Sequence, residues 1–272
     1  MNLTFLIPVK IESQDRVKNI STILCYLLSK FDAVVSVKEC DYETKFQSHI
    51  IPILIEKFGS IPKNLTYVFE KQKSKFFHKT KLLNDLLDKS NTEVVCNYDA
   101  DVLLPESSIL TAYDMIFSKK SDVVYPYGCG VYQKAVTYSQ ETFNTFIKSD
   151  MKVEYLDQYS IKNNSTIGWC QFIRRKNYIK SFMMNENFYA WGPEDCEFYY
   201  RLNFLGNKVD RIDNYVYHLE HTRSNDSWFS NPLWKENTEL WSWIRNQSKE
   251  SFLNYYKNQN YIKQRKQLNV SI

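Results

Sequence analysis

The segment 94–101 reads VVCNYDAD, so an apolar run leads directly into two carboxylates one residue apart, Asp99 and Asp101. A short run of apolar and β-branched residues predicts a buried strand. If that strand belongs to a parallel sheet, its carboxyl end lies at the edge where ligands bind. Two carboxylates at that edge suit a divalent cation such as Mg²⁺ or Mn²⁺. A plain turn is the alternative, because Asp is common in turns that bind nothing.

Apolar runs and helical patterns alternate on both sides of this segment. The expected strands lie at 3–9, 33–37, 66–69, 93–98 and 122–125. The expected helices lie at 15–29, 44–58, 78–89 and 106–117. This alternation predicts an α/β fold with a mostly parallel central sheet and helices on both faces.

The second half of the chain has fewer clear strands. We expect strands at 166–173, 208–212 and 215–219, and a helix at 194–205. After about residue 231 the pattern becomes helical and rich in tryptophan and tyrosine, which predicts two helices. Since no repeat or Pro/Gly-rich linker divides the chain, we expect one domain, 1–230, followed by a helical appendage, 231–272.

Composition narrows the class of protein. The 272 residues include 43% apolar and 16% aromatic residues, which excludes a wholly disordered chain. The net charge of +4 comes from 35 basic and 31 acidic residues, too even a balance for bulk nucleic-acid binding. No window approaches the ~20 apolar residues of a spanning helix. Six scattered cysteines without a C-x-x-C pair suggest a reduced, cytoplasmic chain.

The segment 191–195 reads WGPED and opens the predicted helix at 194–205. Pro193 and two acidic residues at a helix start are ordinary structural choices. The same residues also suit a sugar site. The Trp191 indole can cover the face of a sugar, and a carboxylate such as Glu194 or Asp195 can take a proton from an attacking hydroxyl. The segment alone leaves both interpretations open.

Two further segments carry candidate ligand-binding groups. His218 and His221 follow a predicted strand, and a histidine can complete a carboxylate metal site. On a continuous strand the two would point to opposite faces, so both can bind one metal only if the chain turns at Glu220. The segment 77–84, FHKTKLLN, combines an aromatic residue and two lysines at a helix start. It would contact a base and phosphates, or form a solvated basic face.

Taken in order, these motifs resemble the β-1,4-galactosyltransferase family and its bacterial, family 2-type relatives with the glycosyltransferase A fold. The resemblance covers roughly residues 3 to 225. It rests on IPVK at 7–10, KLLN at 81–84, DAD at 99–101, WGPED at 191–195, RLNFLG at 201–206 and the histidine pair at 218 and 221. It implies a nucleotide-diphospho-sugar transferase fold with a nucleotide-binding half, 1–105, and an acceptor and catalytic half, 106–230.

The resemblance implies a metal site and a donor site. Asp101, with Asp99 close by, would hold Mn²⁺ or Mg²⁺ on the donor diphosphate. His221 would be the histidine ligand, and His218 stands where galactosyltransferases carry a methionine ligand. The residues that would contact the uridine diphosphate are Pro8, Lys10, Phe77 and Lys79.

The resemblance also implies an inverting displacement at the anomeric carbon. Asp195 would be the general base, Glu194 would position the acceptor, and Trp191 would sit on a loop that closes over the donor. Ala190 and Pro193 replace two glycines of the family, and we expect them to restrict that closure.

Two further positions depart from the family pattern and bear on the donor. Trp169 replaces the second glycine of a G-G pair, so an indole lies where backbone normally approaches a ligand. Thr166 stands at the position of the galactose-selecting tyrosine. The smaller threonine predicts that the donor sugar is an N-acetylhexosamine.

The expected partners are a UDP-sugar donor and a saccharide or glycolipid acceptor, with no nucleic acid. The expected setting is the cytoplasm, at the inner membrane face, in surface-polysaccharide synthesis. The tail, 231–272, would touch a membrane or a partner, or pack on its own domain, which we favour.

Two other functions compete with transfer. A sugar-nucleotide nucleotidyltransferase would need a glycine-rich loop after the first strand, and 9–14 contains no glycine. A sugar-binding relative without turnover would not need intact Asp101, Asp195 and His221.

Overall fold

The computed structural model describes residues 1–163, 166–223 and 230–265. Its main sheet has seven strands in the order β10-β6-β9-β4-β1-β2-β3. Their bounds are β1 Leu3–Val9, β2 Val34–Asp41, β3 Leu65–Lys71, β4 Val94–Tyr98, β6 Val123–Tyr125, β9 Cys170–Arg174 and β10 Val209–Arg211. All neighbouring pairs are parallel except those of β9, which runs antiparallel to β4 and β6. The sheet is therefore mostly parallel, as expected.

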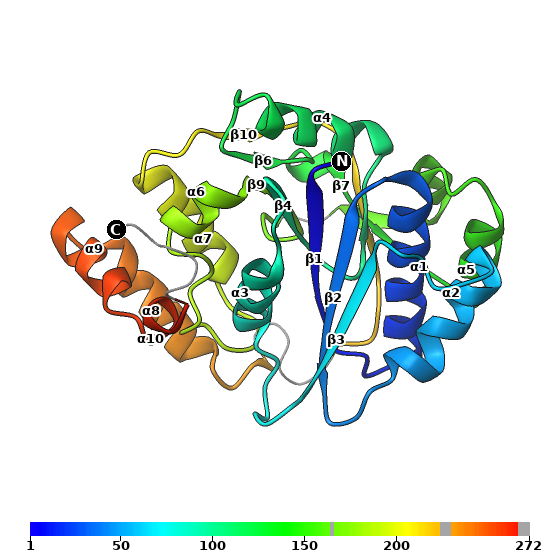
Figure 1. Ribbon diagram of the computed structural model, residues 1–272, viewed down its shortest axis with the longest axis horizontal. Helices are drawn as coiled ribbons and strands as arrows, with labels where there is room; N and C mark the ends of the chain where they lie inside the picture. The colour runs from blue at the N-terminus through cyan, green and yellow to red at the C-terminus, as the bar shows by residue number, and fades with distance from the viewer. Residues whose placement is uncertain (164–165, 224–229, 266–272) are drawn as a thin grey trace.

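Helices cover both faces of this sheet, with α1 and α2 on one side and α3 on the other (Figure 1). The helices are α1 Gln14–Lys30, α2 Ile51–Phe58, α3 Lys79–Lys89, α4 Glu106–Phe117, α5 Gln140–Lys148, α6 Arg175–Lys180, α7 Glu194–Phe204, α8 Trp234–Arg245, α9 Lys249–Lys257 and α10 Asn260–Gln264. Short 3₁₀ and π segments lie at Phe46–Ile50, Gly130–Tyr132 and Val153–Tyr159.

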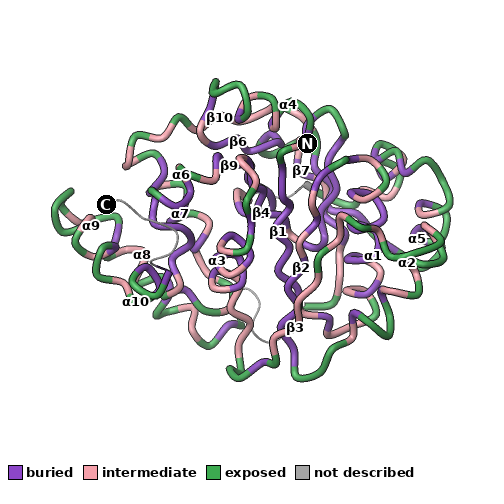
Figure 2. The backbone as a smooth tube through the Cα atoms, viewed as in Figure 1, coloured by how far each residue is buried: buried purple, intermediate pink, exposed green. Residues whose placement is uncertain are grey.

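The core lies along the central strands. Every residue of β1 and of β4 is buried, and Figure 2 shows buried backbone running through the middle of the sheet. Strands buried on both faces read as continuous apolar runs, which is why both segments stood out in the sequence. Burial on both faces also fixes where each strand ends, and with it the position of the residues that follow.

A second sheet of four short strands has the order β5-β11-β7-β8. The strands are β5 Val102–Leu103, β7 Gln133–Val136, β8 Ser160–Asn163 and β11 Val216–Leu219. The sequence indicated only β11. The others have two to four residues, too few to establish an alternating pattern. This small sheet connects the end of β4 to the two histidines.

Several predicted boundaries were wrong. The strand expected at 166–173 begins only at Cys170, because its partner β4 ends at Tyr98, the register partner of Cys170. The tail contains three helices in its described part instead of two, since Lys257 and Asn260 end and begin separate helices. Residues 266–272 lie outside the described part.

The tail packs on its own domain. Ile244, Phe252 and Tyr256 are buried, and α8 packs against α7. None of the helices in the described ranges combines the length and the apolar character needed to cross a bilayer.

Candidate functional site

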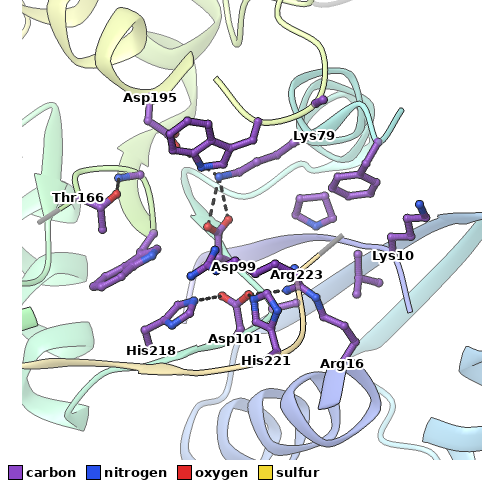
Figure 3. A pocket seen from close by; sticks show the side chains of 18 of the residues that line it. Lys10, Arg16, Lys79, Asp99, Asp101, Thr166, Asp195, His218, His221 and Arg223 are labelled. Atoms are coloured by element: carbon purple, nitrogen blue, oxygen red, sulfur yellow. Dashed lines mark hydrogen bonds and ion pairs between the residues drawn. The ribbon is translucent and has the colours of Figure 1, made fainter. Parts of the chain in front are cut away.

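One pocket lies at the carboxyl ends of β1 and β4, which are parallel neighbours. Pro8 and Lys10 reach it from the end of β1, and Asp99 and Asp101 from the end of β4. The pocket brings together all the catalytic, donor-binding and metal-binding candidates from the sequence: Pro8, Lys10, Phe77, Lys79, Asp99, Asp101, Trp191, Glu194, Asp195, His218 and His221. Segments more than 200 residues apart in the chain, such as those of Lys10 and His221, therefore converge on one site (Figure 3).

The pairing of β5 with β11 brings Asp101 and His218 together. Val102 is the register partner of His218, and the amide of Leu219 donates a 2.8 Å hydrogen bond to the carbonyl of Asp101. As a result, Nε2 of His218 lies 3.9 Å from Oδ1 of Asp101. Backbone pairing fixes this distance.

His221 reaches the same carboxylate because β11 ends at Leu219, so the residues that follow no longer alternate as they do in a strand. Nε2 of His221 lies 3.2 Å from Oδ2 of Asp101. Both imidazoles therefore face the carboxylate of Asp101 (Figure 3). The irregular backbone after Leu219 brings both histidines to one carboxylate, as a joint metal site requires.

The side chains of Asp101, His218 and His221 fit a divalent cation. One potential ligand atom from each residue lies within 4.8 Å of the others. Oδ1 of Asp101 is buried and has no hydrogen-bond partner, which is costly unless a cation occupies that side. One carboxylate with two imidazoles suits Mn²⁺ better than Mg²⁺, which prefers oxygen ligands.

Asp101 is held in its ionised form. Burial works to raise its pKa, but the hydrogen bond with His221 and the charges of His218 and Arg16 hold the pKa well below its ordinary value. A guanidinium nitrogen of Arg16, on α1, lies 2.5 Å from Oδ2. A deprotonated carboxylate is the form that binds a metal.

Asp99 lies outside this ligand group and pairs with a lysine instead. Nζ of Lys79 is 3.0 Å from Oδ1 of Asp99 and 3.5 Å from Oδ2 of Asp195. Burial works to lower the pKa of Lys79, but the two carboxylates raise it well above its ordinary value. Burial raises the pKa of Asp99 to about 7, against the opposing charge of Lys79. Lys79 therefore bridges the two halves of the site.

Glu194 and Asp195 begin α7 on the other side of the pocket. Burial, with the charge of Asp195, raises the pKa of Glu194 to about 8, and Oε2 of Glu194 is buried without a partner. Burial also raises the pKa of Asp195, against the charge of Lys79. Gly168 permits this packing, because a Cβ there would lie 1.8 Å from Oδ2 of Asp195. A carboxylate of raised pKa is a suitable proton acceptor near neutral pH.

This chain is similar to known proteins both in sequence and in structure. The sequence model of a family described as the N-terminal domain of galactosyltransferase matches residues 152–222. No curated protein sequence matches the chain. The structure of residues 1–349 of S. aureus TarS with UDP-GlcNAc is 17% identical with a TM-score of 0.57, and the match covers 93% of this chain and 72% of that one. A longer TarS structure is 16% identical with a TM-score of 0.52, covering 95% and 44% of the two chains.

This chain has the glycosyltransferase A fold. The similarity to TarS extends over nearly the whole chain, and the arrangement of the main sheet agrees with it. The identities are low enough that the similarity establishes the fold and leaves the activity to the site residues. The family match, over residues 152–222, covers β9, Trp191, α7 and both histidines.

Sequence reasoning missed several pocket residues of this glycosyltransferase A fold. Arg16, Glu12 and Arg223 line the pocket. Arg16 lies in the first turn of α1, and Arg223 lies two residues after His221, so closeness to the recognised motifs was the available signal. Trp169 was noted only as a departure, yet its ring stacks on His218 at 5.3 Å and 15°. It therefore orients a candidate metal ligand.

Proposed function

We propose that this chain is an inverting glycosyltransferase that moves a hexose or an N-acetylhexosamine from a UDP-sugar to a saccharide acceptor. One observation carries the proposal. The pocket contains three residues that could bind a cation, namely Asp101, His218 and His221. The same pocket contains two neighbouring carboxyl groups with raised pKa values, those of Glu194 and Asp195. Transfer from a nucleotide sugar requires both a site for the leaving diphosphate and a base for the acceptor hydroxyl.

In this proposal Asp101, His218 and His221 hold Mn²⁺ or Mg²⁺. The bound cation would supply positive charge for the departing diphosphate. Arg16 and Arg223 line the same part of the pocket and add fixed positive charge there. Asp99 supports the site indirectly, because it pairs with Lys79 at 3.0 Å.

The donor would lie along the end of β1 and the start of α3. Pro8, Lys10 and Phe77 line that wall of the pocket and would contact the uridine diphosphate. Trp191 lines the mouth with 37% of its surface exposed, and would cover the sugar. TarS, which shares the fold, was crystallised with UDP-GlcNAc, which supports a nucleotide-sugar ligand.

Asp195 would take the proton from the acceptor hydroxyl. It lines the pocket and is held by Lys79 at 3.5 Å and by contact with the Gly168 backbone position. Glu194, next to it, would position the acceptor through a hydrogen bond, since its raised pKa of about 8 makes it a donor at neutral pH. Attack in line with the leaving diphosphate would invert the anomeric carbon.

Thr166 bears on the donor sugar. Its amide donates to Oε1 of Gln133 at 2.7 Å, and its carbonyl accepts from Nε2 of Gln133 at 2.8 Å. The fully buried Gln133 therefore fixes the position of a small side chain in the pocket wall. A small residue leaves room for an N-acetyl group, and this supports an N-acetylhexosamine donor. Strict use of UDP-galactose in a radiolabelled donor screen would contradict this step.

The biological setting remains part of the proposal. A saccharide or glycolipid acceptor and a role in surface-polysaccharide synthesis fit a glycosyltransferase of this kind.

The experiment is a panel of UDP-, GDP- and TDP-sugars incubated with the protein, Mn²⁺ and a series of saccharide acceptors. We expect transfer, or slow donor hydrolysis, with one UDP-sugar. Release of pyrophosphate from a sugar phosphate and a nucleoside triphosphate would instead identify a nucleotidyltransferase. Binding of a sugar nucleotide without transfer or hydrolysis would identify a non-catalytic relative.

A further inference from the structure

Residues 189–193, here called the Trp191 segment, connect the body of the domain to α7. Ala190 and Trp191 line the pocket, and Glu194 and Asp195 follow directly. The segment is irregular, and Ala190 has a φ of 56°, in the left-handed region. An irregular segment has no helix or sheet partners, so neighbouring residues must satisfy its backbone groups.

The first set of neighbours lies at the start of α3. The amide of Ala190 donates a 3.1 Å hydrogen bond to the carbonyl of Phe77. The ring of Tyr189 stacks on His78, with centroids 3.9 Å apart and planes at 25°. These contacts attach one side of the segment to the donor-binding half of the pocket.

The second set of neighbours comes from the C-terminal appendage. Nδ2 of Asn237, on α8, donates to the carbonyl of Tyr189 at 2.7 Å. Nδ2 of Asn231 donates to the carbonyl of Trp191 at 2.5 Å. Each asparagine has only 3% of its surface exposed. Two carbonyls of the Trp191 segment therefore depend on buried side chains from the appendage.

The indole of Trp191 also rests on the appendage. Its ring stacks on Trp234, the first residue of α8, at 5.1 Å and 25°. The packing behind it is tight, because a Cβ at Gly192 would lie 2.7 Å from Nδ2 of Asn237. In Figure 1 α8 lies beside α7, the helix into which the segment leads.

We propose that Trp234 and Asn237 are positioning residues for the active site. They hold the Trp191 segment from outside the domain, so that the indole of Trp191 stays at the mouth of the donor pocket. The appendage thus supports the Trp191 segment, which itself lines the pocket. The kinetic consequence of this inference rests on the proposed function, whereas the structural consequence does not.

Hydrogen exchange of the full-length protein tests the structural consequence without substrate. In Asn237→Ala and Trp234→Ala, we expect the amides of residues 189–192 to exchange about tenfold faster, because the hydrogen bonds and the stacking that hold the segment are lost. Trp234→Phe keeps an aromatic ring and should stay close to the wild type. Wild-type exchange rates at 189–192 in both alanine variants would overturn the inference.

Asn246→Ala is the matched control. Asn246 lies at the end of the same helix, is exposed, and its side chain donates within the helix, to the carbonyl of Ser242 at 2.7 Å. Its loss should leave exchange at 189–192 unchanged. Thermal unfolding of each variant identifies any general loss of folding, and comparison of exchange at β1 corrects for it.

Steady-state kinetics test the positioning role. In Asn237→Ala and Trp234→Ala we expect the donor KM to rise about tenfold while kcat changes less than threefold, because Asp195 remains in place on α7. Trp234→Phe should restore most of the donor KM. Parameters equal to those of Asn246→Ala would overturn the role. If the wild type uses no nucleotide sugar, the proposed function fails, and the exchange experiment still decides whether the appendage holds the segment.

Discussion

Asp195 lies between Lys79, 3.5 Å away, and the backbone of Gly168, where no side chain fits. This contact fixes the carboxylate at the pocket. We predict that Asp195→Asn lowers kcat by about 10²- to 10⁴-fold, because the amide cannot accept the proton. Binding of UDP, measured calorimetrically, should stay close to the wild type.

The matched control for this variant is Asp114→Asn, an exposed position on α4. It should leave kcat unchanged. Transfer by Asp195→Asn at the wild-type rate would show that another group acts as the base.

The raised pKa of Glu194 should make the stability of the folded protein depend on pH. Burial raises its pKa from an ordinary 4.5 to about 8, so the folded state binds a proton more tightly than the unfolded state. At pH 4 Glu194 is protonated in both the folded and the unfolded state, so its burial carries no ionisation penalty. As the pH rises from about 4.5 to about 8, the unfolded state loses this proton first and the free energy of unfolding decreases. We predict that Glu194→Gln raises the Tm of the metal-free protein at pH 8.5 more than at pH 4.5.

The measurement is thermal unfolding across this pH range in the presence of a chelator. An equal change in Tm at both pH values would show that Glu194 ionises normally in the folded protein. A decrease that grows with pH would show that the carboxylate form is the stabilised one.

At the scale of elements, α7 is fixed by a buried ion pair. Arg201 is fully buried; its guanidinium bonds Glu197 at 2.6 and 3.0 Å and the carbonyl of Met183 at 2.7 Å. The hydroxyl of Tyr256, on α9, donates to the same Glu197. This network joins α7 to the appendage behind Glu194 and Asp195.

We predict that Arg201→Ala lowers the free energy of unfolding by about 3–5 kcal/mol, because it leaves Glu197 charged and buried without the opposite charge of Arg201. Urea unfolding measures the change. The double variant Arg201→Met with Glu197→Leu should recover most of the loss, since it leaves no unpaired charge. A loss below about 1 kcal/mol in Arg201→Ala would mean that water or another cation reaches Glu197.

The length and burial of each helix or strand decided whether the sequence could predict it. The bounds of β1 and α4 were predicted to the residue, and β4 within one, because long or fully buried segments carry strong patterns. The strand β5 has two residues, and no pattern exists at that length. The antiparallel direction of β9 was equally inaccessible, because it depends on the path of the chain between distant segments.

In the candidate site, too, local sequence patterns identified the residues but could not show how they meet. Its residues were named from motifs, and all of them line one pocket. The way they meet depends on contacts that no local pattern encodes. Register pairing of Val102 with His218 joins the metal-binding candidates, and Asn231 and Asn237 reach the Trp191 segment from the tail.

At the scale of the whole molecule, the pocket joins distant parts of the chain, among them the ends of β1 and β4, the starts of α3 and α7 and the segment after β11. A ligand that bridges them should stabilise the folded state as a unit. At a ligand concentration of 100 times Kd, the gain is about 2.7 kcal/mol. Because Oδ1 of Asp101 is free and both histidines adjoin it, UDP should bind well only when a cation is present.

Thermal unfolding with UDP, with and without Mn²⁺, tests the central claim most directly. We predict that UDP raises the Tm of the wild type in Mn²⁺ and has little effect in a chelator, and that Asp101→Asn abolishes the difference. Equal stabilisation by UDP in the chelator, or none in either condition, would contradict a cation-assisted nucleotide-sugar site at Asp101, His218 and His221.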